Sequence, residues 1–249
     1  MAQPARILAA ALALAACWPG RVDARPRRAD RFALEPPAVE STRAFRYAQL
    51  SSDDCLAELD ARGVPYELAP PTKNVETPLR FNGPIRGVTF QPTPRGAPPP
   101  SRGRQVPLLP ATIADCRLAL AIDDLAVVLK KHGVVQAEYL SMYRRNTHMK
   151  PGRRHPSALA IDLATIKLES GKTYSVRYDF HGRVGAQTCG AKATKPTKES
   201  PGARLWRTIA CELAERHSFN LLLTPNYDWG HRDHFHMEVR TGIRWYLIH

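Results

Sequence analysis

The feature that most limits how this chain can fold is a histidine-rich stretch near its C-terminus, residues 230–240. Three of the nine histidines, His231, His234 and His236, fall within six positions, and apolar and polar residues then alternate. Alternation predicts a β-strand, because successive side chains of a strand point to opposite faces. On this strand His234, His236 and Glu238 share one face. Two histidines two positions apart can bind the same metal ion or substrate, so we expect the function of the chain here.

A metal centre needs ligands from a second segment, and the best upstream candidates are His155 and Asp162. If fully extended, the chain between them would separate the two residues by roughly 23 Å, so the segment must curl if both bind one ion. We therefore predict a loop over residues 155–157 and a strand over 159–168. An Asp in so apolar a strand is unfavourable to bury unless it is paired or metal-bound. It could instead cap a turn or accept backbone hydrogen bonds.

The motif His-x6-Asp, followed far downstream by Asp-His-Phe-His, resembles the zinc peptidase superfamily of D-Ala-D-Ala carboxypeptidases, murein endopeptidases and Hedgehog-type domains. More narrowly, the chain resembles the bacterial extensin-like C-terminal domain family, whose members are secreted. The resemblance implies that His155, Asp162 and His236 bind Zn²⁺, with a fourth position open to water in a catalytic site. It also implies a secreted peptidase that hydrolyses amide bonds in peptidoglycan stem peptides or cross-links.

The resemblance leaves the general base open between two residues. Carboxypeptidase relatives have a Glu three positions before the last histidine ligand, where this chain has the shorter Asp233. Murein endopeptidases have a histidine-rich stretch instead, with which His231 and His234 align. Asp233 and His234 therefore both stay candidates, and His231 is expected near the rim of the cleft.

An arginine upstream is the candidate substrate-binding residue. Arg144, eleven residues before His155, matches an arginine with which members of the family hold a substrate carbonyl or carboxylate. A planar guanidinium suits such bidentate contacts. A surface arginine in a basic chain is an equally good interpretation.

The first 25 residues have the pattern of a secretory signal. Arg6 precedes an apolar segment that is too short to span a bilayer as a helix. Leu14-Ala15-Ala16-Cys17 also resembles a lipoprotein cleavage box, which would leave Cys17 lipidated and membrane-attached, whereas ordinary cleavage nearby would remove it. We expect a basic, Pro-rich tether over residues 26–51 and one domain over residues 52–249. The protein is thus expected in the periplasm or cell envelope.

Four cysteines remain if Cys17 is removed or lipidated, an even number that suits an oxidising compartment. They are Cys55, Cys116, Cys189 and Cys211. Four cysteines allow three pairings and the sequence alone does not choose among them; we favour Cys55 with Cys116 and Cys189 with Cys211. The family has a Cys where this chain has Tyr143, which implies that the usual disulfide is absent or rerouted through Cys189.

Periodicity predicts an α+β domain in which a compact antiparallel sheet is flanked by helices, and the resemblance implies a zinc fold of the Hedgehog and D-Ala-D-Ala peptidase type. Helices are expected over residues 55–59, 113–131 and 205–217. Strands are expected over residues 64–68, 134–143, 173–180 and 221–223, with an edge strand at 87–90. The Pro-rich residues 72–110 cannot supply central strands. Exposed segments are expected over residues 98–104 and 180–201.

The net charge of +13 favours anionic partners. Removing residues 1–25, with three arginines and one Asp, leaves +11. Outside the cytoplasm the expected partner is peptidoglycan or another anionic cell-wall polymer before nucleic acid, although the charge could also reflect arginine-rich composition alone. His234-Phe235-His236 would fit a DNA nickase, but the signal sequence and the His155/Asp162 motif argue against it. The main alternative is a non-catalytic zinc module that binds the cell wall or a protein.

Overall fold

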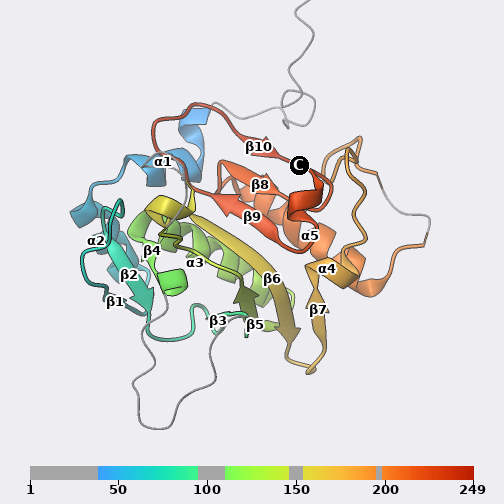
Figure 1. The fold of residues 1–249 in the computed structure, drawn as a ribbon, viewed down its shortest axis with the longest axis horizontal. Coiled ribbons are helices and arrows are strands. Elements are labelled where there is room, and N and C mark those ends of the chain that lie inside the picture. Colours follow the sequence, from blue (N-terminus) through green and yellow to red (C-terminus); the bar gives the residue numbers. More distant parts are fainter. Residues whose placement is uncertain (1–38, 95–109, 146–153, 195–197) are drawn as a thin grey trace, which may run out of the picture.

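The computed structural model describes residues 39–94, 110–145, 154–194 and 198–249. Its main sheet has seven strands, with the longest, β6 (Ala160–Leu168), in the middle (Figure 1). From one edge to the other the order is β10 (Leu247–Ile248), β8 (Leu221–Leu223), β9 (Phe235–Glu238), β6, β5 (Val134–Tyr139) and β3 (Thr89–Pro92). The α+β class is confirmed. The sheet is mixed rather than antiparallel as predicted, because β10 with β8 and β3 with β5 are parallel pairs.

Two strands share one edge of β6. The first half of β6 pairs with β9, and residues 165–167 pair with β7 (Thr173–Ser175). The strand predicted over 173–180 ends early because the next residues form the short helix α4 (Val176–Asp179). There the Asp179 carboxylate accepts a hydrogen bond from the Ser175 backbone N–H (2.7 Å). The end of β7 therefore meets the start of β9 beside β6.

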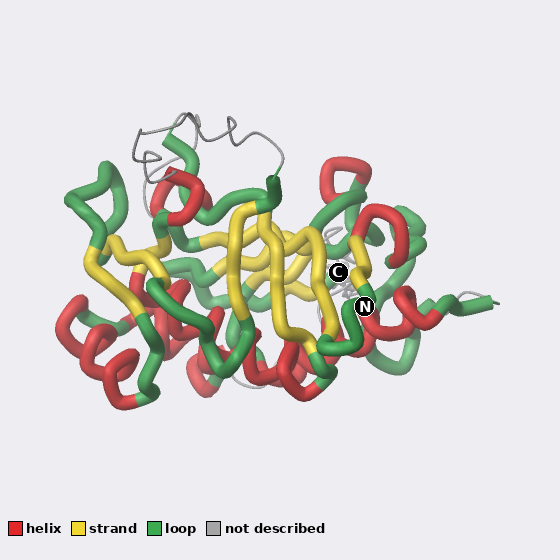
Figure 2. Tube along the Cα trace, turned by 90° about the horizontal axis from the view of Figure 1, so that it is seen from below, coloured by secondary structure: helices red, strands yellow, loops and turns green. Residues whose placement is uncertain are grey.

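Two long helices pack together and cover mainly one face of the sheet (Figure 2). Helix α3 (Cys116–Lys131) begins after Asp115, whose side chain accepts a hydrogen bond from the Arg117 N–H. Helix α5 (Pro201–Arg216) begins in the same way after Ser200. The apolar positions predicted to point inward on both helices are buried except Leu205, which is partly buried, so the helix predictions are confirmed with small shifts at the ends.

Part of the segment predicted as a tether or a partly ordered arm is helical. Residues Arg43–Gln49 form helix α1, in which Tyr47 is fully buried and donates a hydrogen bond to the Asp124 carboxylate of α3 (2.7 Å). Only three residues of α1 are buried, too few to produce the periodicity that would have revealed it. The remaining tether residues, 26–38, and the signal segment lie outside the described residues.

The described residues also form a second, smaller sheet, whose strands do not pair with those of the main sheet. Its order is β1 (Tyr66–Leu68), β2 (Pro78–Phe81) and β4 (Ala114–Asp115). Because β2 is the middle strand, the prediction that residues 72–110 supply no central strand is wrong for this sheet, although Pro78 takes only the first position of the strand. The predicted edge strand corresponds to β3, and residues 98–104 lie outside the described residues. The described residues also contain four 3-10 turns, η2 (Val39–Ser41), η3 (Pro110–Thr112), η4 (His155–Ser157) and η5 (Trp229–His231).

Two disulfides confirm the favoured pairing. Cys55 in α2 (Ser52–Ala61) is bonded to Cys116 at the start of α3, and Cys189 is bonded to Cys211 in α5. Such bonds suit an exported protein in an oxidising compartment. Cys189 is buried, so the segment 180–201 is not the purely surface insertion that was predicted. Among the described residues, no helix has the length and apolar character needed to cross a membrane.

Candidate metal centre

The pairing of β6 with β9 brings Asp162 and His236 together, although 74 residues separate them in sequence. The strands are antiparallel, with Asp162 directly opposite His236. Side chains directly opposite each other in such a pair lie on the same face. His236 Nδ1 lies 2.7 Å from Asp162 Oδ1, and both side chains are buried. Two of the three predicted ligands are therefore in contact.

His155 reaches the same carboxylate from a tight turn. The sequence predicts a loop here, and the structure has the 3-10 turn η4, entered by Arg154 and left by Ala158, both at positive φ (55° and 51°). The Ala158 N–H donates a hydrogen bond to the His155 carbonyl (3.1 Å). This curl places His155 Nε2 3.2 Å from Asp162 Oδ1. The three predicted ligands thus meet at one carboxylate.

The outer nitrogen of each ligand histidine has an acceptor, and this determines which nitrogen faces Asp162. His155 Nδ1 lies 3.1 Å from the Met142 carbonyl, which can only accept, so Nδ1 carries a proton and Nε2 is the nitrogen that faces inward. His236 Nε2 lies 2.5 Å from the Glu238 carboxylate, so Nδ1 is the nitrogen that faces inward. Once any proton on them is released, these two nitrogens and the Asp162 carboxylate form a donor set that fits a divalent cation. Their atoms all lie within 4.8 Å of one another.

Glu238 is a site residue to which sequence reasoning assigned no role. Its fully buried carboxylate accepts from His236, from Arg154 Nε (3.1 Å) and from Arg240 Nε. Burial alone raises the pKa of Glu238, but the hydrogen bond with His236 and the nearby arginines lower it below 4.5. Glu238 therefore stays charged and holds the His236 ring. In the sequence, the one feature that could have revealed this role is that Glu238 lies two residues after His236, on the same face of the strand.

Asp162 and His236 shift each other's pKa. Burial alone raises the pKa of Asp162, but the hydrogen bonds with His155 and His236 outweigh it and hold the pKa well below 3.8. Burial lowers the pKa of His236, whereas its contacts with Asp162 and Glu238 raise it to about 9. A proton and a metal ion would compete for the same His236 Nδ1, so metal binding here would release a proton.

The other two predicted histidines form a second group beside the first. His234 Nε2 lies 3.5 Å from Asp162 Oδ1, and His234 Nδ1 lies 2.9 Å from Asp233 Oδ1. His231, at the end of η5, has Nδ1 2.7 Å from Asp228 Oδ1, and its ring centroid lies 5.3 Å from that of His234. Each of these histidines therefore has its own carboxylate partner. Together with His236 they are a second set of side chains that could hold a metal ion.

Burial and charge act in opposite directions on His231. Burial lowers the pKa of His231, and the contact with Asp228 opposes this change without cancelling it. His231 is consequently neutral at pH 7, with its Nδ1–H donated to Asp228.

Asp233 and Arg144 lie at the edges of this arrangement. The Asp233 carboxylate contacts His234 and lines a neighbouring hollow of about 240 Å³ that also contains Glu138. Arg144 lines the cleft over the ligands, where its half-exposed guanidinium forms an ion pair with Asp162 and donates to Ser141 Oγ (2.7 Å). Of the two predicted bases, His234 is thus the one directed at the ligand group.

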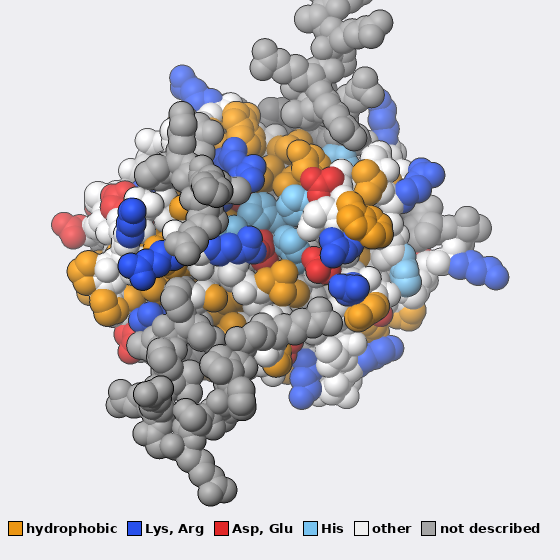
Figure 3. All heavy atoms as spheres, in the orientation of Figure 1, with side chains coloured by type: hydrophobic (Ala, Val, Ile, Leu, Met, Phe, Trp, Pro, Cys, Tyr) orange, Lys and Arg blue, Asp and Glu red, His pale blue; other side chains and the backbone are white. Residues whose placement is uncertain are grey.

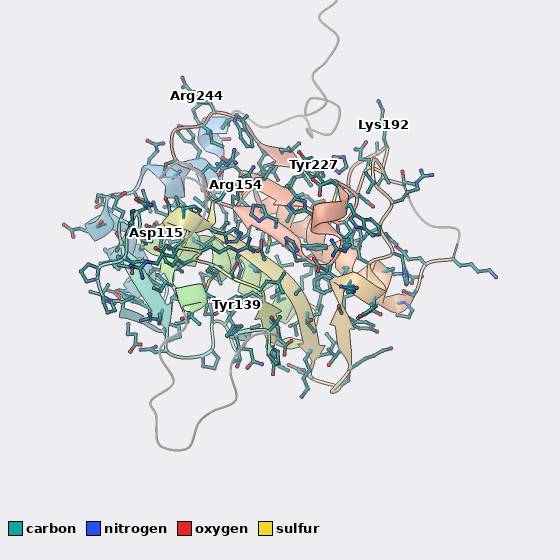
Figure 4. The ribbon with its side chains drawn as sticks, viewed as in Figure 1. Asp115, Tyr139, Arg154, Lys192, Tyr227 and Arg244 are labelled. Atoms are coloured by element: carbon teal, nitrogen blue, oxygen red, sulfur yellow. A yellow bond between two sulfur atoms is a disulfide. The ribbon has the colours of Figure 1, made fainter. Side chains whose placement is uncertain are left out.

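A cleft of about 520 Å³ opens over the ligand group. Figure 3 shows the histidines gathered in the middle of this face, with arginine or lysine and hydrophobic side chains around them. Arg154, which precedes η4, and Tyr227, from the loop after β8, both line the cleft and are labelled in Figure 4. The lining contains three guanidiniums, from Arg144, Arg154 and Arg240, against two carboxylates. This balance favours an anionic group in the cleft.

Fold and site together define a class of protein: a disulfide-bonded α+β domain with a buried histidine–aspartate group that could hold a metal ion. A family model described as "Extensin-like protein C-terminus" matches residues 54–247. The chain therefore belongs to the extensin-like C-terminal family, and the predicted family resemblance is confirmed. No curated protein and no solved structure matches the chain.

Proposed function

We propose that this protein is an exported zinc-dependent peptidase that hydrolyses amide bonds in peptidoglycan stem peptides or cross-links. The observation that carries the proposal is the convergence of His155 Nε2 and His236 Nδ1 on the Asp162 carboxylate. Three such ligands with a fourth position left to water are usual for catalytic zinc. The resemblance of the motif to D-Ala-D-Ala carboxypeptidases and murein endopeptidases, with the zinc fold they share, supports the same reaction.

The chemistry divides between the metal and the chain. When bound, Zn²⁺ supplies a Lewis acid that polarises the scissile carbonyl and lowers the pKa of a bound water towards about 7. His234 is the general base and accepts the proton of the attacking water at Nε2, because Asp233 contacts its other nitrogen. The same Nε2 then donates that proton to the leaving amine. Asp233 thereby orients His234 rather than accepting the proton itself.

Two further residues bind substrate in this proposal. Arg144 offers a half-exposed guanidinium beside Asp162, suited to a substrate carbonyl or carboxylate. His231 donates its Nδ1–H to Asp228, so its Nε2 is an acceptor for a substrate N–H near the rim of the cleft.

Charge and the signal-like N-terminus support an envelope location. A net charge of +13, or +11 without residues 1–25, attracts peptidoglycan or another anionic cell-wall polymer over long range. We infer no nucleic-acid partner, because the signal-like segment directs the chain out of the cytoplasm. Lipidation of Cys17 would add a membrane anchor.

One observation favours a second candidate, a non-catalytic zinc module that binds the cell wall or a protein. Asp233 stands where carboxypeptidase relatives have a catalytic Glu, yet its carboxylate contacts His234 and lines the neighbouring hollow. If His234 cannot serve as the base, the site would hold zinc without hydrolysing an amide.

The test combines metal content with turnover. We would quantify zinc in purified wild-type protein, His236→Ala and the control His132→Ala, and incubate each with peptidoglycan to detect new muropeptides. His132 contacts Glu212 and does not line the cleft, so its loss should change neither result. We expect one zinc per chain, lost only in His236→Ala, and zinc-dependent cleavage. Zinc without cleavage would support the binding module, and protein that binds no zinc would overturn both candidates.

A further inference from the structure

Exposed aromatic side chains gather around the candidate metal centre. Among the described residues, the exposed large apolar side chains are Leu68, Tyr178, Val184, Tyr227, Trp229 and Trp245. Four of the six are aromatic. Tyr227 and Trp245 line the cleft, Tyr178 lines the hollow that contains Asp233, and Trp229 begins the turn that ends at His231. Leu68 and Val184 line neither space.

An arginine guanidinium lies over three of these aromatic rings. Arg177 lies over Tyr178 (5.5 Å to the ring centroid), Arg232 over Trp229 (5.5 Å) and Arg240 over Trp245 (5.1 Å). The contact holds the guanidinium against the ring by cation–π attraction. Arg240 is buried and its Nε donates to Glu238, so the exposed Arg177 and Arg232 are the arginines with N–H groups left to bind carboxylates. The same unit, a flat apolar face joined to a cation, thus occurs at the cleft, at the hollow and at the turn η5.

The units lie at both ends of β9, with His236 between them. Arg240 and Trp245 follow β9 in the chain, whereas the hollow with Tyr178 adjoins Asp233, which precedes β9. Four residues of strand span roughly 13 Å. A ligand that contacts both ends while an amide lies at the histidines must therefore be longer than one sugar or one amino acid.

We propose that the three aromatic–arginine pairs, Tyr178–Arg177, Trp229–Arg232 and Trp245–Arg240, bind the glycan strand that carries the scissile peptide. This inference rests on the proposed function and names the form of its substrate: an amide presented by an intact glycan polymer, not a free peptide. Aromatic faces pack well against the C–H faces of sugar rings, and guanidinium edges suit the carboxylates of the stem peptides that the strand carries.

The chemistry of the pairs favours a glycan over other occupants. A protein partner usually buries a continuous apolar core, whereas these aromatic side chains are separated by histidines and arginines. A membrane surface would attract the arginines, but aromatic rings that line a cleft or a hollow are poorly placed to contact a flat bilayer. Charge complementarity and continuity with the candidate centre point to a long, anionic, ring-containing ligand.

The test uses peptide-free glycan strands, prepared by removing the stem peptides from peptidoglycan so that their freed carboxylates make them anionic. Affinity is measured for wild type, Trp229→Ala, Tyr178→Ala and the control Leu68→Ala. Truncating an aromatic anchor commonly weakens binding about fivefold or more. We expect that loss for both aromatic variants and no change for Leu68→Ala, which removes a side chain with similar exposure (64%) that lines neither the cleft nor the hollow.

Neutral dextran and anionic phospholipid vesicles serve as competing ligands. Strand binding that is absent, unaffected by both aromatic variants or matched by dextran would overturn the proposal. Vesicle binding lost in the same variants would assign the face to a membrane and overturn it as well. No peptide bond is present in the strands, so strand binding without peptidoglycan cleavage would leave this inference standing while the proposed function fails.

Discussion

Two groups of histidines meet at this cleft, and they differ in burial and in their carboxylate partners. His155 and His236 are buried and share one carboxylate, that of Asp162. His231 and His234 are partly exposed, and each has a separate aspartate within three residues in sequence. Sharing one carboxylate brings several donor atoms to one point, which suits a cation. A separate partner orients each imidazole individually, which suits proton transfer or substrate contact.

The largest effect expected from this comparison follows removal of the base. His234→Ala should lower turnover of peptidoglycan by about 10²–10⁴-fold and leave zinc content unchanged, because His234 belongs to the second group. Asp233→Asn should produce a smaller loss, since it changes only the orientation of His234. Zinc analysis alongside muropeptide release measures both. Loss of zinc in His234→Ala would show that the two groups act as one metal site.

A smaller effect is expected from the residue that holds a ligand in place. Glu238→Gln removes the charge that fixes the His236 ring, and changes to such outer partners typically weaken metal affinity about 10–100-fold. Competition with a chromophoric chelator measures the zinc affinity. Glu212→Gln, at a surface carboxylate that also contacts a histidine, is the matched control and should have no effect. An unchanged affinity in Glu238→Gln would contradict the assigned role.

The two groups should also differ in the sign of their pH dependence in chelator-treated protein. The pKa of His236 is raised from 6.5 to about 9, so its contribution to stability is complete below pH 6.5 and lost as the pH rises through 9. The pKa of His231 is lowered, so its contribution is present above pH 6.5 and lost as the pH falls through the folded-state value.

Thermal unfolding between pH 5 and 10 tests this sign. We expect the decline in Tm from pH 7 to 9.5 to be smaller in His236→Gln than in wild type. The decline in His231→Gln should equal that of wild type. Equal slopes in all three proteins would mean that His236 does not retain its proton in the folded chain.

The smallest effect concerns the turn that delivers His155. Ala158 is fully buried at a φ of 51°, a left-handed conformation that favours glycine. Ala158→Gly should therefore stabilise the fold by about 0.5–1 kcal/mol, or roughly 2 °C in Tm. Ala137→Gly, in the buried strand β5, should destabilise it instead, because glycine weakens a strand interior. A lower Tm for Ala158→Gly would mean that the turn is not strained.

Much of the candidate site followed from local pattern in the sequence. Alternation after Asp233 put His236 and Glu238 on one face of a strand, and the short distance between His155 and Asp162 required a curled segment. The long amphipathic segment of α3 was also predictable from its apolar periodicity. In each case residues within one element interact mainly with near neighbours, so composition and spacing carry the information.

Elements with few buried residues were not predictable in this way. Helix α1 contains Tyr47, which is buried and donates a hydrogen bond from its hydroxyl to the Asp124 carboxylate, 77 residues away in the sequence. The end of β7 at Ser175 depends on a contact with Asp179 across α4. Such elements are stabilised by partners, and their own periodicity is too weak to reveal them.

The sequence by itself determined which residues could form the metal centre: a histidine strand, an Asp-bearing strand and a turn with His155. Only the tertiary structure decided that Asp162 stands opposite His236, that Asp233 contacts His234 away from the ligands, and that aromatic–arginine pairs surround the cleft. The physical reason is that strand register and side-chain direction depend on contacts between segments far apart in the chain, which no local pattern encodes.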